Sequence, residues 1–341
     1  MTEIPLPAGR PKPFLTALVR ARKGGAAAAA ETLLSLAAQT SQDFEVVVLV
    51  ETAGDAEIGD FEDLVESFDG AFSVRVRVVG LGHGGERSAL SAGVDAANGA
   101  FIAVIDPDDV VFAHWVESFA VAGARSDGRV LRSIVATQRF TVSSDRGQRA
   151  YTSIDRPRCP WPGPFDVLGH LDGTPGPIFG LAIPTALADW CPPLGPSGPE
   201  LEDWAVVLNA ALGCGVTETG EVTYLRRLVG DEQDMSGHTD DAGLEEARRV
   251  IISELDRRDV TMPAGNLVTL KMQSDDNRAL RTEVGSLRAE LDQAKEESDQ
   301  LVSSRAEAAR QVEEMRASAS WRLSMPVRVA GRLARQLRHR A

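Results

Sequence analysis

The segment Asp106-Pro107-Asp108-Asp109 holds three carboxylates within four residues. Like charges held this close repel one another unless a cation neutralises them. Mg²⁺ or Mn²⁺ takes oxygen ligands and keeps positions open for phosphate oxygens, so the segment predicts a divalent metal site that suits a diphosphate leaving group. The alternative is a solvated acidic turn or a helix cap, because Asp-Pro-Asp is favourable turn chemistry.

The acidic segment directly follows an apolar run, residues 101–105, that is typical of a buried strand. The other elements predicted before it are strands over 14–19, 44–50 and 74–79 and helices over 26–39 and 88–97. Strands that alternate with helices predict an α/β fold with a mostly parallel sheet flanked by helices. Ligands of such sheets bind beyond the carboxyl ends of the strands, which is where the acidic segment lies.

The rest of the globular part is less regular. Residues 137–199 are rich in Pro and Gly and show little helical periodicity, so we expect long loops there that shape a pocket. Further elements are predicted as a helix over 201–212 that acidic residues open, a strand over 221–225, and a helix over 244–257.

Composition excludes several classes of protein. The chain has 341 residues, 43% of them hydrophobic, enough for one large core or two modest ones, and its net charge of −14 argues against nucleic-acid binding. The three cysteines share no CxxC spacing, which favours neither a disulfide framework nor a zinc site and suits a reducing cytosol. No stretch has the roughly 18 uncharged apolar residues of a membrane-spanning helix, so we expect a cytoplasmic protein.

A heptad repeat runs from Asn277 to Met315, and we assign a coiled coil to residues 263–317. Its a positions are Asn277, Val284, Leu291, Ser298, Arg305 and Val312, and its d positions are Leu280, Leu287, Ala294, Leu301, Ala308 and Met315. Four of these six pairs contain a polar residue or alanine, so the repeat predicts a coiled coil of modest strength, and a homodimer if it pairs.

Several motifs together resemble glycosyltransferase family 2. Residues 33–48, with Gln39-Thr40 and Asp43-Phe44-Glu45-Val46, resemble the family's "SL..QT..DFEV" opening, and residues 89–103 resemble its "A.N.G...A.G.YIA" stretch, with Ser91 in place of Asn. The acidic segment stands where the family has "D.DD", and Glu202-Asp203-Trp204 resembles its "EDW".

This resemblance covers about residues 14–235 and implies the GT-A fold. The implied organisation is a nucleotide-sugar-binding half over 1–115, an acceptor-binding half over 116–262, the coiled coil over 263–317 and a tail over 318–341.

The resemblance also implies roles for the acidic residues. Asp108 would bind Mn²⁺ or Mg²⁺, and Asp106 would lie nearer the ribose. Asp109 would support the site or ligate the metal together with these two residues. Asp203, beside Glu202, is the candidate general base that takes the proton of the acceptor hydroxyl in an inverting transfer. The alternative for this pair is favourable charge at a helix N-terminus.

Donor or metal binding is expected from four further residues, with His238 as the metal candidate. Many family members carry paired aspartates after the second strand, whereas this chain has Val50-Glu51, so Glu51 would replace one of them. Arg87 follows a Gly-rich loop and would neutralise phosphate, although a flexible turn explains the loop equally well. Arg226 and His238 lie where the family supplies groups that bind phosphate or metal, although a lone histidine is more often a surface residue.

The C-terminal tail is strongly basic, with seven arginines and no Asp or Glu from residue 316 onward. Residues 320–328 resemble the "SWR.T.PLR" ending that follows coiled coils in some bacterial polysaccharide glycosyltransferases. Trp321 and the aliphatic residues between the arginines suit an anionic membrane surface, which predicts peripheral attachment at the inner face of the cell membrane. A basic disordered tail or a helix that docks on a partner is the alternative.

The resemblance therefore predicts a metal-dependent, inverting glycosyltransferase. It would move a sugar from a nucleotide-diphosphate donor to a glycan or a lipid-linked acceptor in polysaccharide synthesis. A catalytically idle GT-A domain that binds nucleotide sugars or presents its coiled coil is the main alternative, because the nucleoside motif is altered at Val50-Glu51. A third hypothesis is a nucleotidyltransferase, and residues 20–25 are the segment most similar to the phosphate loop of such enzymes.

Overall fold

The structure is a computed structural model of the whole chain. The residues that it describes are 12–21, 24–51, 55–81, 89–145, 148–171, 178–190, 199–229, 245, 248–253, 256–257, 259–262 and 264–338. The chain divides into two compact units, Met1–Leu267 and Val268–Ala341.

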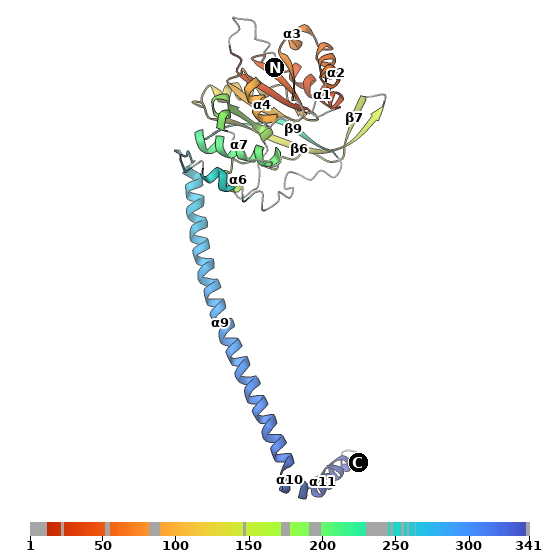
Figure 1. Cartoon of the computed structure of the whole chain (residues 1–341), viewed down its shortest axis with the longest axis vertical. Coiled ribbons are helices and arrows are strands. Elements are labelled where there is room, and N and C mark those ends of the chain that lie inside the picture. The colour runs from red at the N-terminus through yellow and green to blue at the C-terminus, as the bar shows by residue number, and fades with distance from the viewer. Residues whose placement is uncertain are drawn as a thin grey trace. The chain divides into compact units, whose positions relative to one another are not determined.

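The N-terminal part is a parallel β-sheet whose strands are connected by helices (Figure 1). Its strands are β1 (Leu15–Ala21), β2 (Phe44–Val50), β3 (Val76–Gly80) and β4 (Phe101–Ile105), paired in the order β3-β2-β1-β4. The helices between them are α1 (Ala26–Ala37), α2 (Asp55–Glu66), α3 (Gly70–Ser73) and α4 (Ala89–Ala96). All four strands end at one edge of the sheet because they run parallel.

Burial explains why these segments become strands. Every residue of β2 and β4 is buried, as expected for parallel strands covered on both faces. Gly99 permits a close approach beside β1, because a Cβ atom there would lie 2.4 Å from the backbone nitrogen of Thr16. The sequence prediction of an α/β fold with a mostly parallel first sheet is confirmed.

The sheet continues through a mixed second part in the order β8-β6-β9-β5, with β7 beside β6. The elements of this part are β5 (Val110–Val111), α5 (Trp115–Gly123), β6 (Val130–Asp145), β7 (Gln148–Ser153), α6 (Val167–Leu171), η1 (Ile178–Gly180), β8 (Leu181–Pro184), η2 (Thr185–Trp190), α7 (Pro199–Cys214) and β9 (Val216–Val229). Strand β8 runs antiparallel to both β4 and β6 and so joins the two parts.

The long strands correct one prediction. We expected loops throughout 137–199, but β6 and β7 form an antiparallel hairpin up to residue 153, and β8 lies at 181–184. The prolines of this region follow β7 in the sequence. The segment before them therefore has all its backbone N–H groups available for pairing between strands. Strand β9 is also longer than the predicted 221–225, because it pairs in parallel with β6 along most of its length.

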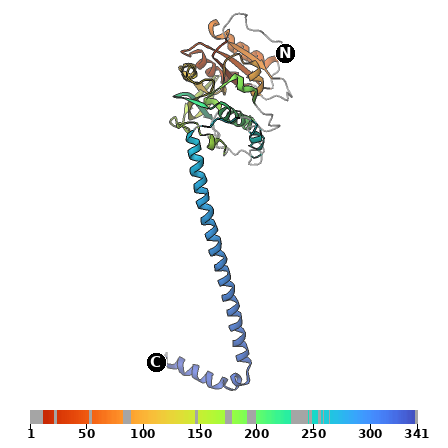
Figure 2. The ribbon, with the colours of Figure 1, turned by 90° about the vertical axis from the view of Figure 1, so that its left-hand side faces the viewer.

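The C-terminal unit is helical. Helix α9 (Ala264–Ala317) is one uninterrupted helix of 54 residues, about 80 Å long at 1.5 Å per residue (Figures 1 and 2). The side chain of Ser318 caps α10 (Ala319–Leu323), and α11 (Met325–Arg338) follows. The predicted helix over 263–317 is confirmed, whereas its pairing into a coiled coil stays a prediction.

Candidate functional site

The acidic turn lies directly after β4 and is held by α1. The hydroxyl of Thr32 lies 2.6 Å from the carbonyl oxygens of both Pro107 and Asp109, and the Asp109 nitrogen donates to the carbonyl of Asp106. These hydrogen bonds fix the backbone of the turn, so its three carboxylates point to different neighbours.

Asp109 is the inward carboxylate of the turn. It is buried, its Oδ2 accepts a hydrogen bond from the Tyr224 hydroxyl at 2.6 Å, and its Oδ1 accepts from the Arg227 backbone nitrogen at 2.8 Å. Burial and the nearby charge of Asp106 raise the pKa of Asp109 from 3.8 to about 7, against the effect of these hydrogen bonds. Both oxygens are occupied, so Asp109 ties β9 to the acidic turn.

Arg20 joins the acidic turn to the predicted base. Its Nη1 donates to both carboxylate oxygens of Asp203, at 2.8 and 2.9 Å, and its Nη2 donates to Oδ1 of Asp106 at 3.3 Å. Burial raises the pKa of Asp203 to about 6, although the Arg20 guanidinium opposes that rise. Three residues that are far apart in the sequence therefore form one cluster at the carboxyl ends of β1 and β4.

Sequence analysis did not identify Arg20 as part of the site. The available signal was its position, since a cation near the carboxyl end of an apolar strand is costly to bury without an acidic partner. Recognising that partner required the pairing of β1 with β4, which places Arg20 beside the acidic turn.

Asp108 faces the β6–β7 hairpin. Its Oδ1 accepts hydrogen bonds from Nη1 of Arg149 at 2.9 Å and from the Tyr151 hydroxyl at 2.7 Å. Both donors lie on β7, in the region that we had expected to be a loop, and so the sequence analysis missed them as well.

Two arginines lie over the ring of Phe179. The guanidinium carbons of Arg20 and Arg226 lie 5.4 and 4.9 Å from its centroid. Buried Nη1 of Arg226 has no hydrogen-bond partner among the residues that the structure describes. A buried donor of this kind is suited to an anionic oxygen supplied from outside the protein.

The acidic turn fits a divalent cation. The side chains of Asp106 and Asp108 are 33% and 37% exposed, and all their side-chain contacts within the described part of the chain use Oδ1, which leaves both Oδ2 oxygens available. Mg²⁺ sites commonly use one or two carboxylates and complete their shell with water and substrate phosphate. In the described residues no group of three or more His, Cys, Asp and Glu side chains is placed to bind a metal by itself.

The remaining predicted residues are distributed around this cluster. Glu202 precedes Asp203 on α7, and Glu51 directly follows β2, with its backbone nitrogen 2.9 Å from the carbonyl oxygen of Ala21 at the end of β1. Glu51 therefore lies at the same edge of the sheet as the acidic turn. Arg87 and His238 lie outside the described residues.

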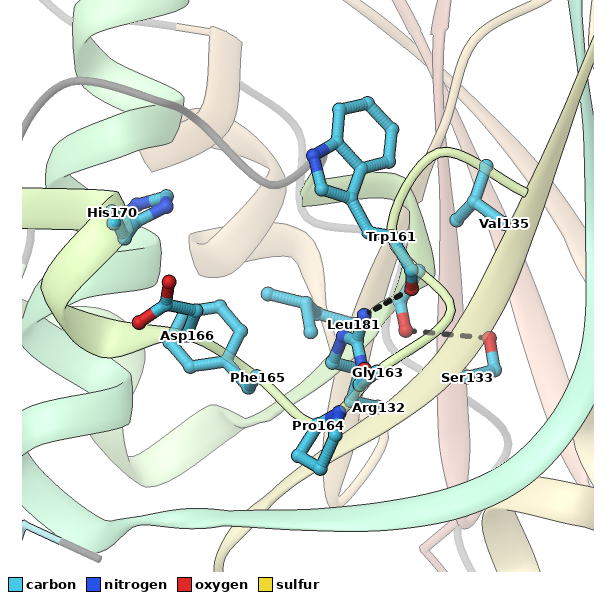
Figure 3. A pocket seen from close by; sticks show the side chains of 12 residues that line it. Arg132, Ser133, Val135, Trp161, Gly163, Pro164, Phe165, Asp166, His170 and Leu181 are labelled. Atoms are coloured by element: carbon cyan, nitrogen blue, oxygen red, sulfur yellow. Dashed lines mark hydrogen bonds between the residues drawn. The ribbon is translucent and has the colours of Figure 1, made fainter. Parts of the chain in front are cut away.

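A separate pocket of about 200 Å³ lies among β6, α6 and the segment before α6 (Figure 3). Trp161, Phe165 and Leu181 supply apolar walls, and Asp166 and His170 line another side. Burial lowers the pKa of His170 to about 4, so its imidazole is neutral at physiological pH. None of the acidic-turn residues lines this pocket, and we assign it no role in the cluster.

The comparisons with known proteins bear on the fold and the family. Residues 22–169 match the model of Glycosyl transferase family 2, which confirms the resemblance found in the sequence over those residues. The crystal structure of S. aureus TarS 1-349 in complex with UDP-GlcNAc has a TM-score of 0.50 at 18% identity, over 71% of this chain and 66% of that chain. Another TarS structure has a TM-score of 0.49 at 17% identity, over 71% of this chain and 39% of that one.

This likeness supports the GT-A fold, and at such low identity it shows the fold alone. The chain spans just under two thirds of the length of the TarS 1-349 chain. The search among curated proteins found no match.

Proposed function

Because residues 22–169 carry the sequence of glycosyl transferase family 2, we propose that this protein is an inverting glycosyltransferase. Its donor is a nucleoside-diphosphate sugar, and its acceptor is a glycan or a lipid-linked acceptor in polysaccharide synthesis. A TarS structure of the same fold was solved with UDP-GlcNAc, which makes that donor the first to test here.

The observation that carries this proposal is the contact of Arg20 with both Asp203 and Asp106. Through it, the predicted base lies beside the acidic turn, at the sheet edge where α/β proteins bind their ligands. Base and donor site must be adjacent, because the acceptor oxygen attacks the anomeric carbon while the diphosphate leaves.

In the proposed reaction, a new bond forms between the acceptor oxygen and the anomeric carbon as the bond from that carbon to the diphosphate oxygen breaks. The bonding pair leaves with the diphosphate, and Asp203 takes the proton of the acceptor hydroxyl. With a pKa of about 6, Asp203 is ionised at neutral pH and is basic enough to accept that proton. Glu202 adds negative charge beside it.

Asp108 and Asp106 would hold Mn²⁺ or Mg²⁺, which supplies positive charge to the leaving diphosphate. Asp109 supports the turn from inside through Tyr224 and β9. We assign Arg226 to the diphosphate because of its unsatisfied Nη1, and Glu51 to the nucleoside because of its position after β2. Arg87 and His238 keep the donor-binding and metal-binding roles that the sequence suggests.

The helical C-terminal unit supports two further proposals. Described apolar heptad residues of α9, among them Leu280, Leu287 and Leu291, are exposed along the single chain, which favours a coiled-coil homodimer. Helix α11 separates its arginines from its aliphatic residues, as a helix that lies on an anionic membrane does. No described helix is long and apolar enough to span a bilayer. We therefore propose a cytoplasmic enzyme attached peripherally through 318–341.

One observation favours the second candidate, an idle GT-A domain that binds nucleotide sugar. Both oxygens of Asp203 accept hydrogen bonds from Arg20, so the base must weaken that pairing before it can take a proton. A domain of that kind would bind the donor and leave it intact.

Acceptor-independent hydrolysis of UDP-GlcNAc and related donors, with and without Mn²⁺, separates the two candidates. We expect Mn²⁺-dependent release of UDP, reduced about 10²- to 10⁴-fold in Asp203→Asn and in Asp108→Asn. Asp63→Asn changes an exposed carboxylate on α2 and serves as the matched control. Donor binding without turnover in the wild-type protein would favour the idle domain.

A further inference from the structure

The β6–β7 hairpin lies against the acidic turn through two side chains of β7. The strands pair from Phe140 and Ser153 at one end to Asp145 and Gln148 at the other. Between these ends, Arg149 and Tyr151 both donate to the same oxygen of Asp108. The hairpin therefore places a positive charge on the carboxylate that we assign to the metal.

The two side chains differ in how firmly they are held. The ring of Tyr151 lies 4.2 Å from the guanidinium carbon of Arg227 and packs edge-on against Phe140. Arg227 is itself paired with Glu31 on α1, so Tyr151 is fixed to the body of the domain. Arg149 is 36% exposed, and its ion pair is with Asp108.

This arrangement makes a bound cation and the Arg149 pair competitors. A guanidinium nitrogen 2.9 Å from Oδ1 repels a divalent ion that approaches the same carboxylate, and Oδ1 already has two donors. Ion pairs of this exposure contribute little stability, so a divalent ion can displace the arginine. A displaced Arg149 would remain at the acidic turn, where a diphosphate would lie, and guanidinium groups bind phosphate oxygens in a bidentate manner.

We propose that Arg149 is a donor-site residue with two alternative partners. It neutralises Asp108 in the ligand-free protein, yields that carboxylate to a divalent cation, and then binds the diphosphate of the nucleotide donor. Tyr151 positions it by fixing β7 to Arg227. This inference rests on the proposed function, because it takes the acidic turn as the donor site.

The test compares Mn²⁺ binding and UDP binding, both measured by calorimetry on the full chain. Arg149→Gln should bind Mn²⁺ about three- to fivefold more tightly than wild type, because the competing charge is gone. In saturating Mn²⁺ it should bind UDP roughly tenfold more weakly, because a charged hydrogen bond to phosphate is lost. Effects in opposite directions distinguish this role from a structural one, which would weaken both.

Three further variants complete the design. Arg139→Gln is the matched control, since Arg139 lies on the same hairpin and pairs with Asp155, and both affinities should stay at the wild-type values. Tyr151→Phe removes the hydroxyl and keeps the ring on Arg227, so Mn²⁺ should bind slightly more tightly. Asp108→Asn shows which part of the measured heat of Mn²⁺ binding comes from this site, because that part should be absent in the variant.

The outcomes separate the inference from the function. If wild type binds Mn²⁺ and UDP through Asp108 but Arg149→Gln leaves both affinities unchanged, or weakens both, the role of Arg149 is wrong and the glycosyltransferase proposal stands. If no protein in the series binds Mn²⁺ at Asp108, the metal site of the proposed function fails, and the inference fails with it.

Discussion

Replacing Arg20 by Gln should cause a loss of stability that grows with pH. The guanidinium contacts both oxygens of Asp203 and one oxygen of Asp106. Burial already raises the pKa of Asp203 from 3.8 to about 6 in the presence of Arg20. In the variant the same carboxylate stays buried without its cation, so its pKa rises further.

The sign of the pH dependence follows from where the proton binds more tightly. Asp203 binds its proton more tightly in the folded chain, so its contribution to stability is fully present below pH 3.8 and is lost as pH rises to about 6. That loss is about 3 kcal/mol in the wild type, at 1.36 kcal/mol per pKa unit. In Arg20→Gln the loss continues at higher pH.

The expected difference between the two proteins is therefore pH-dependent. Removing one partner of a buried ion pair costs about 3–5 kcal/mol, which we expect near pH 8.5. Near pH 5.5 the Asp203 carboxyl is mostly protonated and needs no cation. The remaining loss there comes from the partly exposed pair with Asp106 and should be at most about 1 kcal/mol.

Urea unfolding of wild type and Arg20→Gln at both pH values measures these differences, and contributions common to both proteins cancel. The double variant Arg20→Gln with Asp203→Asn removes the buried charge together with its partner, and it should recover most of the stability at pH 8.5. A deficit of equal size at both pH values, or a double variant no more stable than the single one, would refute the view that Arg20 offsets a buried charge.

Three further predictions concern packing, pH and assembly. Gly99→Ala should lower the unfolding free energy by about 1–3 kcal/mol in urea, because its Cβ would meet the backbone of Thr16, whereas Gly59→Ala on α2 has open space and should be neutral or stabilising. Burial lowers the pKa of His170 from 6.5 to about 4. The stability that the neutral imidazole contributes, about 3 kcal/mol, is therefore lost as pH falls from 6.5 to about 4. The unfolding free energy of His170→Asn should accordingly decline less between about pH 6.5 and about pH 5 than that of the wild type. Truncation after residue 263 should reduce the number of chains per particle in light scattering from two to one if α9 pairs, and an unchanged number would remove the dimer proposal.

Much of the fold could be predicted because burial leaves a local trace in the sequence. Strands β2 and β4 are continuous apolar runs, and both were placed correctly. The heptad register from Asn277 to Met315 likewise lies within α9, although it does not mark the N-terminal end of the helix at Ala264. Parallel order followed from the alternation of strands with helices, which leaves few other topologies.

The β6–β7 hairpin could not be predicted in the same way. Most of its described side chains are exposed, including those at 141, 143, 149, 150, 152 and 153. Its strands are also rich in polar side chains, so apolar content does not identify them. Their pairing depends on β9, which is distant in sequence and lies along β6. Arg149 and Tyr151 were missed for this reason, since only that pairing brings them to the acidic turn.

The structure also changes the electrostatic argument for a metal. We inferred a cation because three adjacent carboxylates must be neutralised, yet the protein provides its own partners. Arg20 binds Asp106, Arg149 binds Asp108, and Tyr224 donates to Asp109. Two of the three carboxylates of the acidic turn therefore have an arginine partner before any ligand arrives.

A nucleoside diphosphate would add negative charge to this site, and buried Nη1 of Arg226 offers it an unsatisfied donor. In the proposed function the cation would therefore serve chiefly the diphosphate, and its binding would free Arg149 to add a further positive group. On this argument donor and metal affinity are linked, because each ligand brings the charge that the other requires. UDP should accordingly bind much more weakly without Mn²⁺, and Mn²⁺ should bind more weakly without UDP by the same factor.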